Sequence, residues 1–304
     1  HGGFYFSKSM LLNDEVLSKL ELCHDFAPLH TGAHLQGIRG CLSVMPGVPQ
    51  VLVFDTAFHQ TMPPESYMYA LPYEMYEKYH IRRYGAHGTS HRYVAGEMIK
   101  LLGGKAEGTK IITCHIGNGS SISAVKDGKV LDTSMGFTPL AGIMMGTRCG
   151  DIDATILPYI MEETGMSAKE MDTALNKQSG LLGISGVSSD SRDIEDGINN
   201  GDERCILAQK MYVKRIVDFI AKYYVELGGC DAIIFTAGVG ENSISTRMEV
   251  MEKLACLGVK PDEERNNVRG KEALISADNS KIPVYVIPTN EELMIATDTY
   301  NLAK

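Results

Sequence analysis

The 304-residue sequence has no tryptophan, no apolar run of membrane-spanning length and no C-x-x-C pair. A transmembrane helix needs about 20 consecutive apolar residues, so we expect a soluble protein. The seven cysteines are scattered and odd in number, which predicts free thiols in a reducing cytoplasm rather than a disulfide framework. The start, His1-Gly2-Gly3, has neither a Met nor a signal-like segment, as is typical of a chain that begins in mid-sequence.

Positive charge is also scarce. Lys and Arg total 29 against 38 Asp and Glu, which gives a net charge of −9 and a pI of about 5.5. This balance argues against nucleic acid or an anionic membrane as the main partner, although a few local cations would suffice for a small anionic substrate. Hydrophobic residues make up 44% of the chain, which suits one large or two moderate globular domains.

Strand-like and helical patterns alternate along the chain, which predicts an α/β fold. Two turn signals, Asn118-Gly119 and Asp127-Gly128, separate β-rich runs and predict consecutive antiparallel strands. Residues 27–33 (APLHTGA) favour a loop. Apolar periodicity and end signals predict helices over 14–22, 89–102, 152–163, 166–177, 204–227, 248–257 and 290–303.

The run VLVFDTAFHQTMP, residues 51–63, places Asp55 directly after an apolar, β-branched stretch. Open α/β sheets present catalytic groups in this way, at the carboxyl end of a buried strand. A structural aspartate that caps the next turn explains the same local pattern.

Two glycine-rich turns could hold an anion. In HIGNGSS, residues 115–121, glycines would let backbone N–H groups converge, although an ordinary type I′ turn fits equally. In FTAGVGENS, residues 235–243, a strand ends in a glycine turn that opens a helix. That arrangement suits a nucleotide phosphate, but it lacks the G-x-G-x-x-G pattern and also fits a simple tight turn.

Three further segments carry charged or titratable side chains in loops. Arg148, in GTRCGDID, could fork onto phosphoryl or carboxylate oxygens, or could pair with Asp151 or Asp153. Glu291, in PTNEE, could serve Mg²⁺ through water, or could simply stabilise a helix start. His87 lies among small residues at another helix start.

Two histidine pairs, His30 with His34 and His87 with His91, have H-x-x-x-H spacing, which raises the question of zinc. Neither pair has the Glu of H-E-x-x-H, and no cysteine cluster lies nearby, so the sequence disfavours a zinc site.

Taken together and in this order, the motifs APLH, VFDTAFHQTMP, YG-x-HGTSH, HIGNGSS, GTRCGDID, TAGVGENS and PTNEE resemble those of acetate kinases. The resemblance runs from His1 to the last helix. It implies an actin-like ATPase fold of ribonuclease-H-like α/β domains. It also implies transfer of the ATP γ-phosphoryl to acetate, giving acetyl phosphate and ADP, with Mg²⁺ or Mn²⁺, in a cytoplasmic homodimer formed through the C-terminal domain.

The resemblance also assigns roles to residues of this sequence. They are catalytic Asp55, His87, Arg148 and His30; nucleotide-binding His115, Gly117, Asn118, Gly119, Gly238, Gly240 and Asn242; acyl-pocket Leu29, Ala86 and Pro139; and metal-binding Glu291. Acetate has a pKa near that of Glu, about 4.3, and is already ionised at pH 7. Asp55 is therefore expected to orient groups or hold the metal rather than to abstract a proton.

Two departures from the family pattern matter. The family's N-terminal segment, with a first phosphate hairpin and an Arg, has no counterpart here. We therefore expect residues 1–57 and 293–304 to be the remnant of an N-terminal domain, 58–292 to be the C-terminal domain, and the 304 residues alone to have little activity. Ala86 stands where the family usually has Phe, which could admit a longer acid such as propionate, unless Tyr84 or Tyr93 fills the space.

Three other functions compete with an acetate kinase. The first is a short-chain acyl kinase that prefers propionate, and the second is a non-catalytic, dimerising fragment that binds nucleotide. An actin-like ATPase is disfavoured, because it would need a positioned water instead of a carboxylate pocket.

Overall fold

The computed structural model describes residues 1–23 and 28–304, with the backbone alone for 28–30. The strands are β1 (Met10–Leu11), β2 (Val51–Leu52), β3 (Lys110–Ile116), β4 (Ser120–Lys126), β5 (Lys129–Thr133), β6 (Ala232–Thr236), β7 (Ala273–Leu274) and β8 (Val284–Val286). The longer helices are α1 (Asp14–Leu22), α2 (Pro28–Val44), α5 (Gly88–Leu101), α6 (Ile156–Thr164), α7 (Ala168–Lys177), α9 (Ser191–Asn199), α10 (Glu203–Leu227), α12 (Ile244–Lys253) and α14 (Glu291–Leu302).

Short helices complete the fold. They are α3 (Pro64–Tyr67), α4 (Tyr73–Tyr79), α8 (Gly180–Ser185), α11 (Ala237–Asn242), α13 (Glu263–Asn266) and the 3-10 helices η2 (Ala57–Thr61) and η3 (Ala255–Leu257). Within the described ranges, no helix is both long and apolar enough to cross a membrane.

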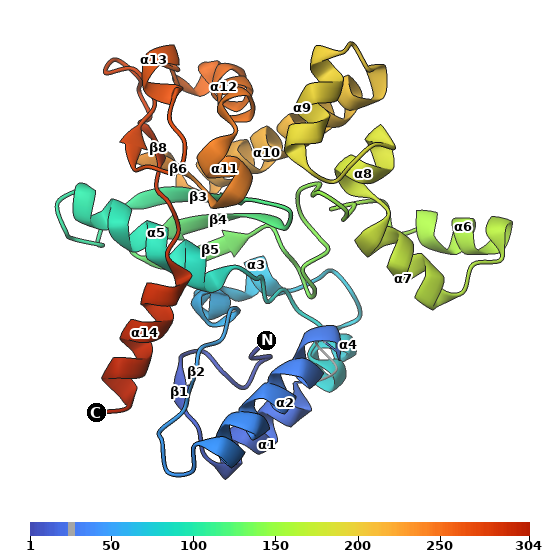
Figure 1. Ribbon diagram of the computed structural model, residues 1–304, viewed down its shortest axis with the longest axis vertical. Coiled ribbons are helices and arrows are strands. Elements are labelled where there is room, and N and C mark those ends of the chain that lie inside the picture. Colours follow the sequence, from blue (N-terminus) through green and yellow to red (C-terminus); the bar gives the residue numbers. More distant parts are fainter. Residues whose placement is uncertain (24–27) are drawn as a thin grey trace.

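A six-stranded mixed sheet lies at the centre, in the order β5-β4-β3-β6-β8-β7. Strands β3, β6 and β8 are parallel neighbours, and the other pairs are antiparallel. Helix α10 covers one face and α5 the other, so this part of the molecule is a helix–sheet–helix sandwich (Figure 1). The predicted α/β class is confirmed.

The alternation of side chains along β3 explains the two faces. Ile112 and Cys114 join the buried cluster under α10, whereas Ile111 packs under α5. Thr113 and His115 point to the same face as Ile111 and bond to side chains of α5. The α5 face is therefore apolar at one end of the strand and polar, although buried, at the other.

A smaller part of the molecule lies beside the sandwich and contains β1, β2, α1 and α2 (Figure 1). A separate apolar cluster holds it together and includes Phe6, Val16, Leu20 and Phe54. Helix α14 runs from the end of the sandwich toward this part and contacts both α5 and β2. The proposed domain limits, 1–57 with 293–304 and 58–292, stay a prediction, because these clusters do not set a boundary residue.

Asp55 joins the two parts. Its carboxylate accepts hydrogen bonds from the backbone N–H groups of His87, at 2.7 Å, and Thr89, at 3.4 Å. Its carbonyl oxygen accepts from Gly88 N at 2.8 Å. The aspartate therefore caps α5, thirty residues further along the chain, where unpaired N–H groups favour a negative charge.

Several predictions of local structure were wrong. Residues 28–33 are helical, because α2 begins with Pro28, a residue suited to a first helical position, and its buried Leu35 anchors it to the smaller core. The expected buried strand over 51–54 is only the two-residue, half-buried β2, since β1 is its single partner. The helix expected from residue 152 begins at Ile156.

The two hairpin turns differ from each other. Asp127 and Gly128 have φ values of 53° and 73°, which fit the tight turn that this dipeptide predicts. No residue of Gly117–Gly119 has a positive φ, so this three-residue connection is not a type I′ turn. All seven cysteines are free, as predicted.

The contact between Asp55 and α5 leads to a stability prediction. A methyl group on Gly88 would lie 2.3 Å from Asp55 O, and neither backbone can move without breaking the cap. We expect Gly88→Ala to lower the free energy of unfolding by about 2–4 kcal/mol in urea titrations.

Gly96 in the same helix is the matched control, because a methyl group there meets nothing within 4 Å. Gly96→Ala should stabilise the protein by about 0.5–1 kcal/mol. Equal unfolding energies for the two variants would contradict this account of the junction.

Candidate active site

The carboxyl ends of the parallel strands β3, β6 and β8 meet at one edge of the sheet. His115 lies at the end of β3, Ala237 follows β6, and Thr289 follows β8. The Glu241 carboxylate ties two of these ends together, because it accepts from Ala237 N at 2.8 Å and from Thr289 N at 3.1 Å. Such an edge is where open α/β sheets bind ligands.

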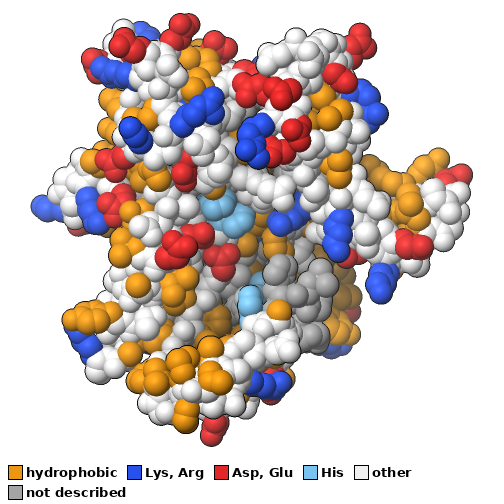
Figure 2. Space-filling model, viewed as in Figure 1, with side chains coloured by type: hydrophobic (Ala, Val, Ile, Leu, Met, Phe, Trp, Pro, Cys, Tyr) orange, Lys and Arg blue, Asp and Glu red, His pale blue; other side chains and the backbone are white. Residues whose placement is uncertain are grey.

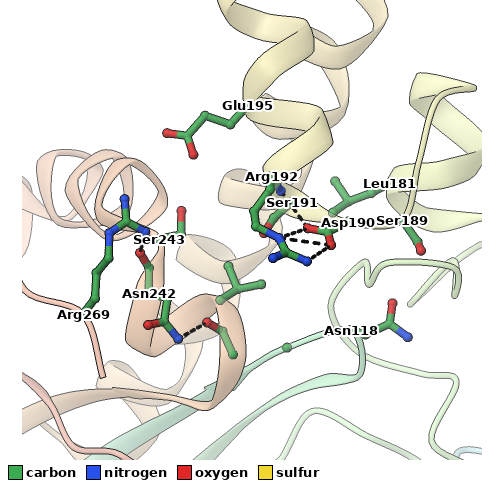
Figure 3. Close-up of a pocket in the computed structure, with 13 residues that line it drawn as sticks. Asn118, Leu181, Ser189, Asp190, Ser191, Arg192, Glu195, Asn242, Ser243 and Arg269 are labelled. Atoms are coloured by element: carbon green, nitrogen blue, oxygen red, sulfur yellow. Dashed lines mark hydrogen bonds and ion pairs between the residues drawn. The ribbon is translucent and has the colours of Figure 1, made fainter. Parts of the chain in front are cut away.

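A cavity of about 460 Å³ opens at this edge (Figure 3). Gly117, Asn118, Gly238 and Asn242, all proposed from sequence as nucleotide-binding, line it. Gly240 does not line it, because the open side of this glycine faces Ile116 and Phe235 in the core. The cavity therefore lies between the β3–β4 connection and the start of α11.

The four charged residues that line the cavity were not proposed from the sequence: Asp190, Arg192, Glu195 and Arg269. Asp190 and Arg192 form an ion pair on one wall, opposite Asn242 and Arg269 (Figure 3). Hydrogen bonds from Arg192 hold the pKa of Asp190 at about 2. Asp190 is also the N-cap of α9, and this capping pattern, Ser-Asp-Ser-Arg, was the available signal.

A fully buried arginine supports the other wall. Arg247 donates to the carbonyl oxygens of Gly240, Asn266 and Val268, and to the Asn266 side chain. Burial, with a smaller contribution from Arg269, lowers the pKa of Arg247 to about 10. In the described part of the chain Arg247 has no carboxylate partner, so its charge is balanced only by neutral oxygens.

His87 and Arg148 converge beside the β3–β4 connection. A methyl group built on Gly119 would lie 3.3 Å from His87 Nε2 and 3.4 and 3.5 Å from the two terminal nitrogens of Arg148. The bare glycine thus leaves a space with an imidazole and a guanidinium at its edge. A space of this kind suits an anion.

The guanidinium of Arg148 is held without a charged partner. It donates to Pro139 O at 2.9 Å, and among the described residues no carboxylate forms an ion pair with it. The alternative pairing with Asp151 or Asp153 is therefore wrong. Asp151 accepts from Gly142 N, and Asp153 accepts from Thr155. Burial lowers the pKa of Arg148.

Four histidines, His59, His87, His91 and His115, form a cluster under α5. His87 stacks on His115 with ring centroids 4.0 Å apart, and His59 meets His91 edge-on. Burial is the main cause that lowers the pKa of His59 to about 4 and that of His87 to about 3. Burial likewise puts the pKa values of His91 and His115 well below 6.5, so all four rings are neutral at pH 7.

Hydroxyl groups bond to these rings, although Nδ1 of His59 has no hydrogen-bond partner among the described residues. His91 bonds to Thr113 and Ser121, His115 to Ser90, and His59 to Ser123. Both nitrogens of His91 are therefore occupied, and no group of three possible metal ligands occurs within the described ranges. Figure 2 shows histidine side chains at the bottom of a hollow, next to acidic side chains.

Asp55 and Glu291 lie close enough together for the charge of one to affect the other. Burial, followed by the charges of Asp55 and Glu292, raises the pKa of Glu291. Glu291 also opens α14, as the sequence indicated. Because the carboxylates of Asp55 and Glu291 repel each other, a cation bound between them would be stabilised.

The structure places two of the four remaining residues that the sequence analysis assigned to the site. The side chains of His30 and Leu29 lie outside the described residues. Ala86 directly precedes His87, and Pro139 contacts Arg148 through its carbonyl oxygen, so both lie near the space at Gly119.

Comparison with known proteins decides the family. The model of the acetokinase family matches residues 1–297. The chain belongs to the acetokinase family. An acetate kinase of Phocaeicola vulgatus is 59% identical over 299 residues, which cover 98% of this chain and 75% of that protein.

Solved structures of family members agree with the fold. The acetate kinase of Porphyromonas gingivalis superposes with a TM-score of 0.96 at 50% identity, over 100% of this chain and 76% of that one. A propionate kinase of Francisella tularensis gives 0.95 at 48% identity, over 99% and 77%. The predicted actin-like α/β fold of the acetokinase family is therefore confirmed.

The neutral histidines predict how stability depends on pH. Each folded-state pKa lies below the unfolded value of about 6.5, so each ring contributes stability above pH 6.5 that is lost as the pH falls toward the folded value. We expect each ring to lower the free energy of unfolding by about 1 kcal/mol between pH 7.5 and pH 5.5, measured by urea unfolding at the two pH values.

The variant His59→Gln tests the source of this effect. It should reduce the loss of stability between the two pH values by one histidine's share, about 1 kcal/mol. An unchanged pH dependence in the variant would show that His59 does not contribute.

Proposed function

We propose that this protein is an acetate kinase, which transfers the γ-phosphoryl group of ATP to acetate and gives acetyl phosphate and ADP. The observation that carries the proposal is the convergence of His87 Nε2 and Arg148 on the space at Gly119, next to the cavity. Membership of the acetokinase family supports the same reaction.

In this proposal the nucleoside occupies the cavity between the Asp190–Arg192 pair and the Asn242–Arg269 wall, with its phosphates along Gly117–Gly119. The terminal phosphoryl then lies beside His87 and Arg148. Arg148 is suited to stabilise charge there, because no carboxylate of the described residues pairs with its fork, which is partly buried.

Acetate would bind beyond the phosphoryl, near Ala86 and Pro139. Because it is ionised at pH 7, it needs alignment rather than a general base. Asp55 supports this alignment indirectly, because its carboxylate accepts hydrogen bonds from backbone N–H groups that position His87. The protein's contribution is therefore geometry and charge neutralisation in an in-line transfer.

Glu291, with Asp55, would hold Mg²⁺ or Mn²⁺. Burial and the nearby charges of Asp55 and Glu292 raise the pKa of Glu291, and a cation beside these carboxylates would offset that repulsion. Few protein oxygens also fit Mg²⁺, which usually keeps several waters and phosphate oxygens as ligands. The ion would supply charge neutralisation on the phosphates.

A preference for propionate is the second candidate. It is favoured by the small side chain of Ala86 beside His87, and a propionate kinase is among the similar structures. Acetate and propionate therefore belong in the same assay.

The test is a coupled ADP-release assay with each acid, on the full gene product and on the 304-residue chain. We expect acetate-dependent release from the full product and a much lower rate from the 304 residues, as predicted from sequence. In the active form, Arg148→Ala should lower kcat by about 10²–10³ without loss of folding.

Arg215→Ala is the control, because Arg215 lies half-exposed on α10 and forms an ion pair with Asp218. The kcat of this control variant should stay within about twofold of the parent value. Near-normal turnover of Arg148→Ala would remove Arg148 from the reaction, and absence of release with either acid from the full product would refute the function.

The homodimer expected from sequence stays part of this proposal. Helices α6 and α7 project from the body (Figure 1), and apolar side chains gather there (Figure 2). Ile156 and Tyr159 on α6 are 41% and 64% exposed. We propose that a second copy covers this face.

Light scattering of Tyr159→Lys tests the dimer. The variant should shift the mass toward a monomer, since a buried charge without a partner is costly. Tyr79→Lys, at a tyrosine on α4 that is 60% exposed, should keep the mass of the parent protein. A dimer that survives Tyr159→Lys would exclude this face.

A further inference from the structure

A chain of four side chains leads from the sheet to His87. His87 Nδ1 shares a hydrogen bond with Ser121 Oγ at 2.9 Å, and Ser121 Oγ shares another with His91 Nε2 at 2.7 Å. His91 Nδ1 then meets Thr113 Oγ1 at 2.7 Å. Ser121, His91 and Thr113 are fully buried, so water does not replace any link.

The protons of this chain obey a simple constraint. A serine hydroxyl has one proton, so Ser121 can donate to only one of its two imidazole neighbours. In the described structure Ser121 Oγ has no third partner to receive that proton. It therefore donates to one ring and accepts from the other, which leaves two self-consistent arrangements for neutral rings.

In the first arrangement, Thr113 donates to His91 Nδ1, His91 Nε2–H donates to Ser121, and Ser121 donates to His87 Nδ1. The proton of His87 is then on Nε2, which faces the space at Gly119. In the second arrangement every direction is reversed, and Thr113 must donate to Ser123 O over 3.4 Å. His87 would then present a lone pair to that space.

An anion beside Nε2 distinguishes the two. A lone pair facing a phosphoryl oxygen is repulsive, whereas an N–H donor gains a charge-assisted hydrogen bond. The hydrogen bond from Thr113 to Ser123 O is long, so it stabilises the second arrangement only weakly. The first arrangement therefore prevails when a phosphoryl group occupies the space at Gly119.

We infer that Ser121 is a positioning residue for the proposed reaction: its hydroxyl donates to His87 Nδ1 and holds the ring with Nε2–H toward the phosphoryl. The chain behind it, through His91 to Thr113, sets the direction of that donation. The inference rests on the proposed function, because the selecting anion is the phosphoryl of ATP.

Ser121 also restrains the ring itself. Without this bond, His87 could turn over about its Cβ–Cγ bond, which would move Nε2 away from the space beside Arg148. Removal of the hydroxyl should therefore lower the rate of transfer more than the binding of either substrate.

Long-range ¹H–¹⁵N correlation of histidine-labelled protein measures the tautomers directly. With ATP bound, we expect His87 protonated on Nε2, with Nδ1 as a hydrogen-bond acceptor. His87→Gln assigns its signals. A Nδ1–H form of His87 in the ATP-bound protein would overturn the inference, whatever the variants do.

Kinetics of Ser121→Ala give the second readout. We expect kcat to fall about tenfold, with KM for acetate and ATP within about twofold, and the Nδ1 signal of His87 to lose its hydrogen-bond shift. Ser123→Ala is the matched control. It lies two residues along β4 on the same face and bonds to His59, and it should leave kcat unchanged.

Equal kcat values for Ser121→Ala and Ser123→Ala would also overturn the inference. Failure of the proposed function is seen separately, because it would abolish acetate-dependent ADP release in the parent protein. The tautomer is therefore measured on a preparation whose acetate-dependent ADP release has first been recorded.

Discussion

The junction between Asp55 and the start of α5 is the constraint on which the site depends. Both the carboxylate and the carbonyl oxygen of one residue hold three successive N–H groups of another segment. Gly88 is needed there because no Cβ fits against the aspartate backbone. This contact holds His87, whose backbone is left-handed with a φ of 59°.

The buried hydroxyls on the α5 face are the second requirement. Serines and threonines near the carboxyl end of β3 and the amino end of β4 let the sheet accept imidazoles where a continuous apolar face would exclude them. The rings stay neutral, so Arg148 brings positive charge to the space at Gly119 without competition from histidinium. The same sandwich therefore combines an apolar core with a polar corner.

The sequence was most informative where the signal is local. The caps Asn13 and Ser167, the Asp-Gly turn and the long helix α10 were all predictable from a few neighbouring residues. The motifs also located most of the cavity's glycines. What the sequence left open depended on distant contacts: the capping of α5 by Asp55, the isolation of Arg148 from nearby aspartates, and the Asp190–Arg192 wall. The alternation of polar residues along β3 and β4 was a readable signal of the histidine cluster that a search for motifs passes over.

Arg247 has a consequence for the heat resistance of the protein. The charge of Arg247 lies in the wall behind the Gly240 turn, and its neighbours are neutral oxygens and Arg269. Arg269 lines the cavity, so a polyanion bound there would offset the charge that helps to lower the pKa of Arg247. Binding of such a polyanion should then raise the temperature at which the protein unfolds, by an amount set by its affinity and concentration.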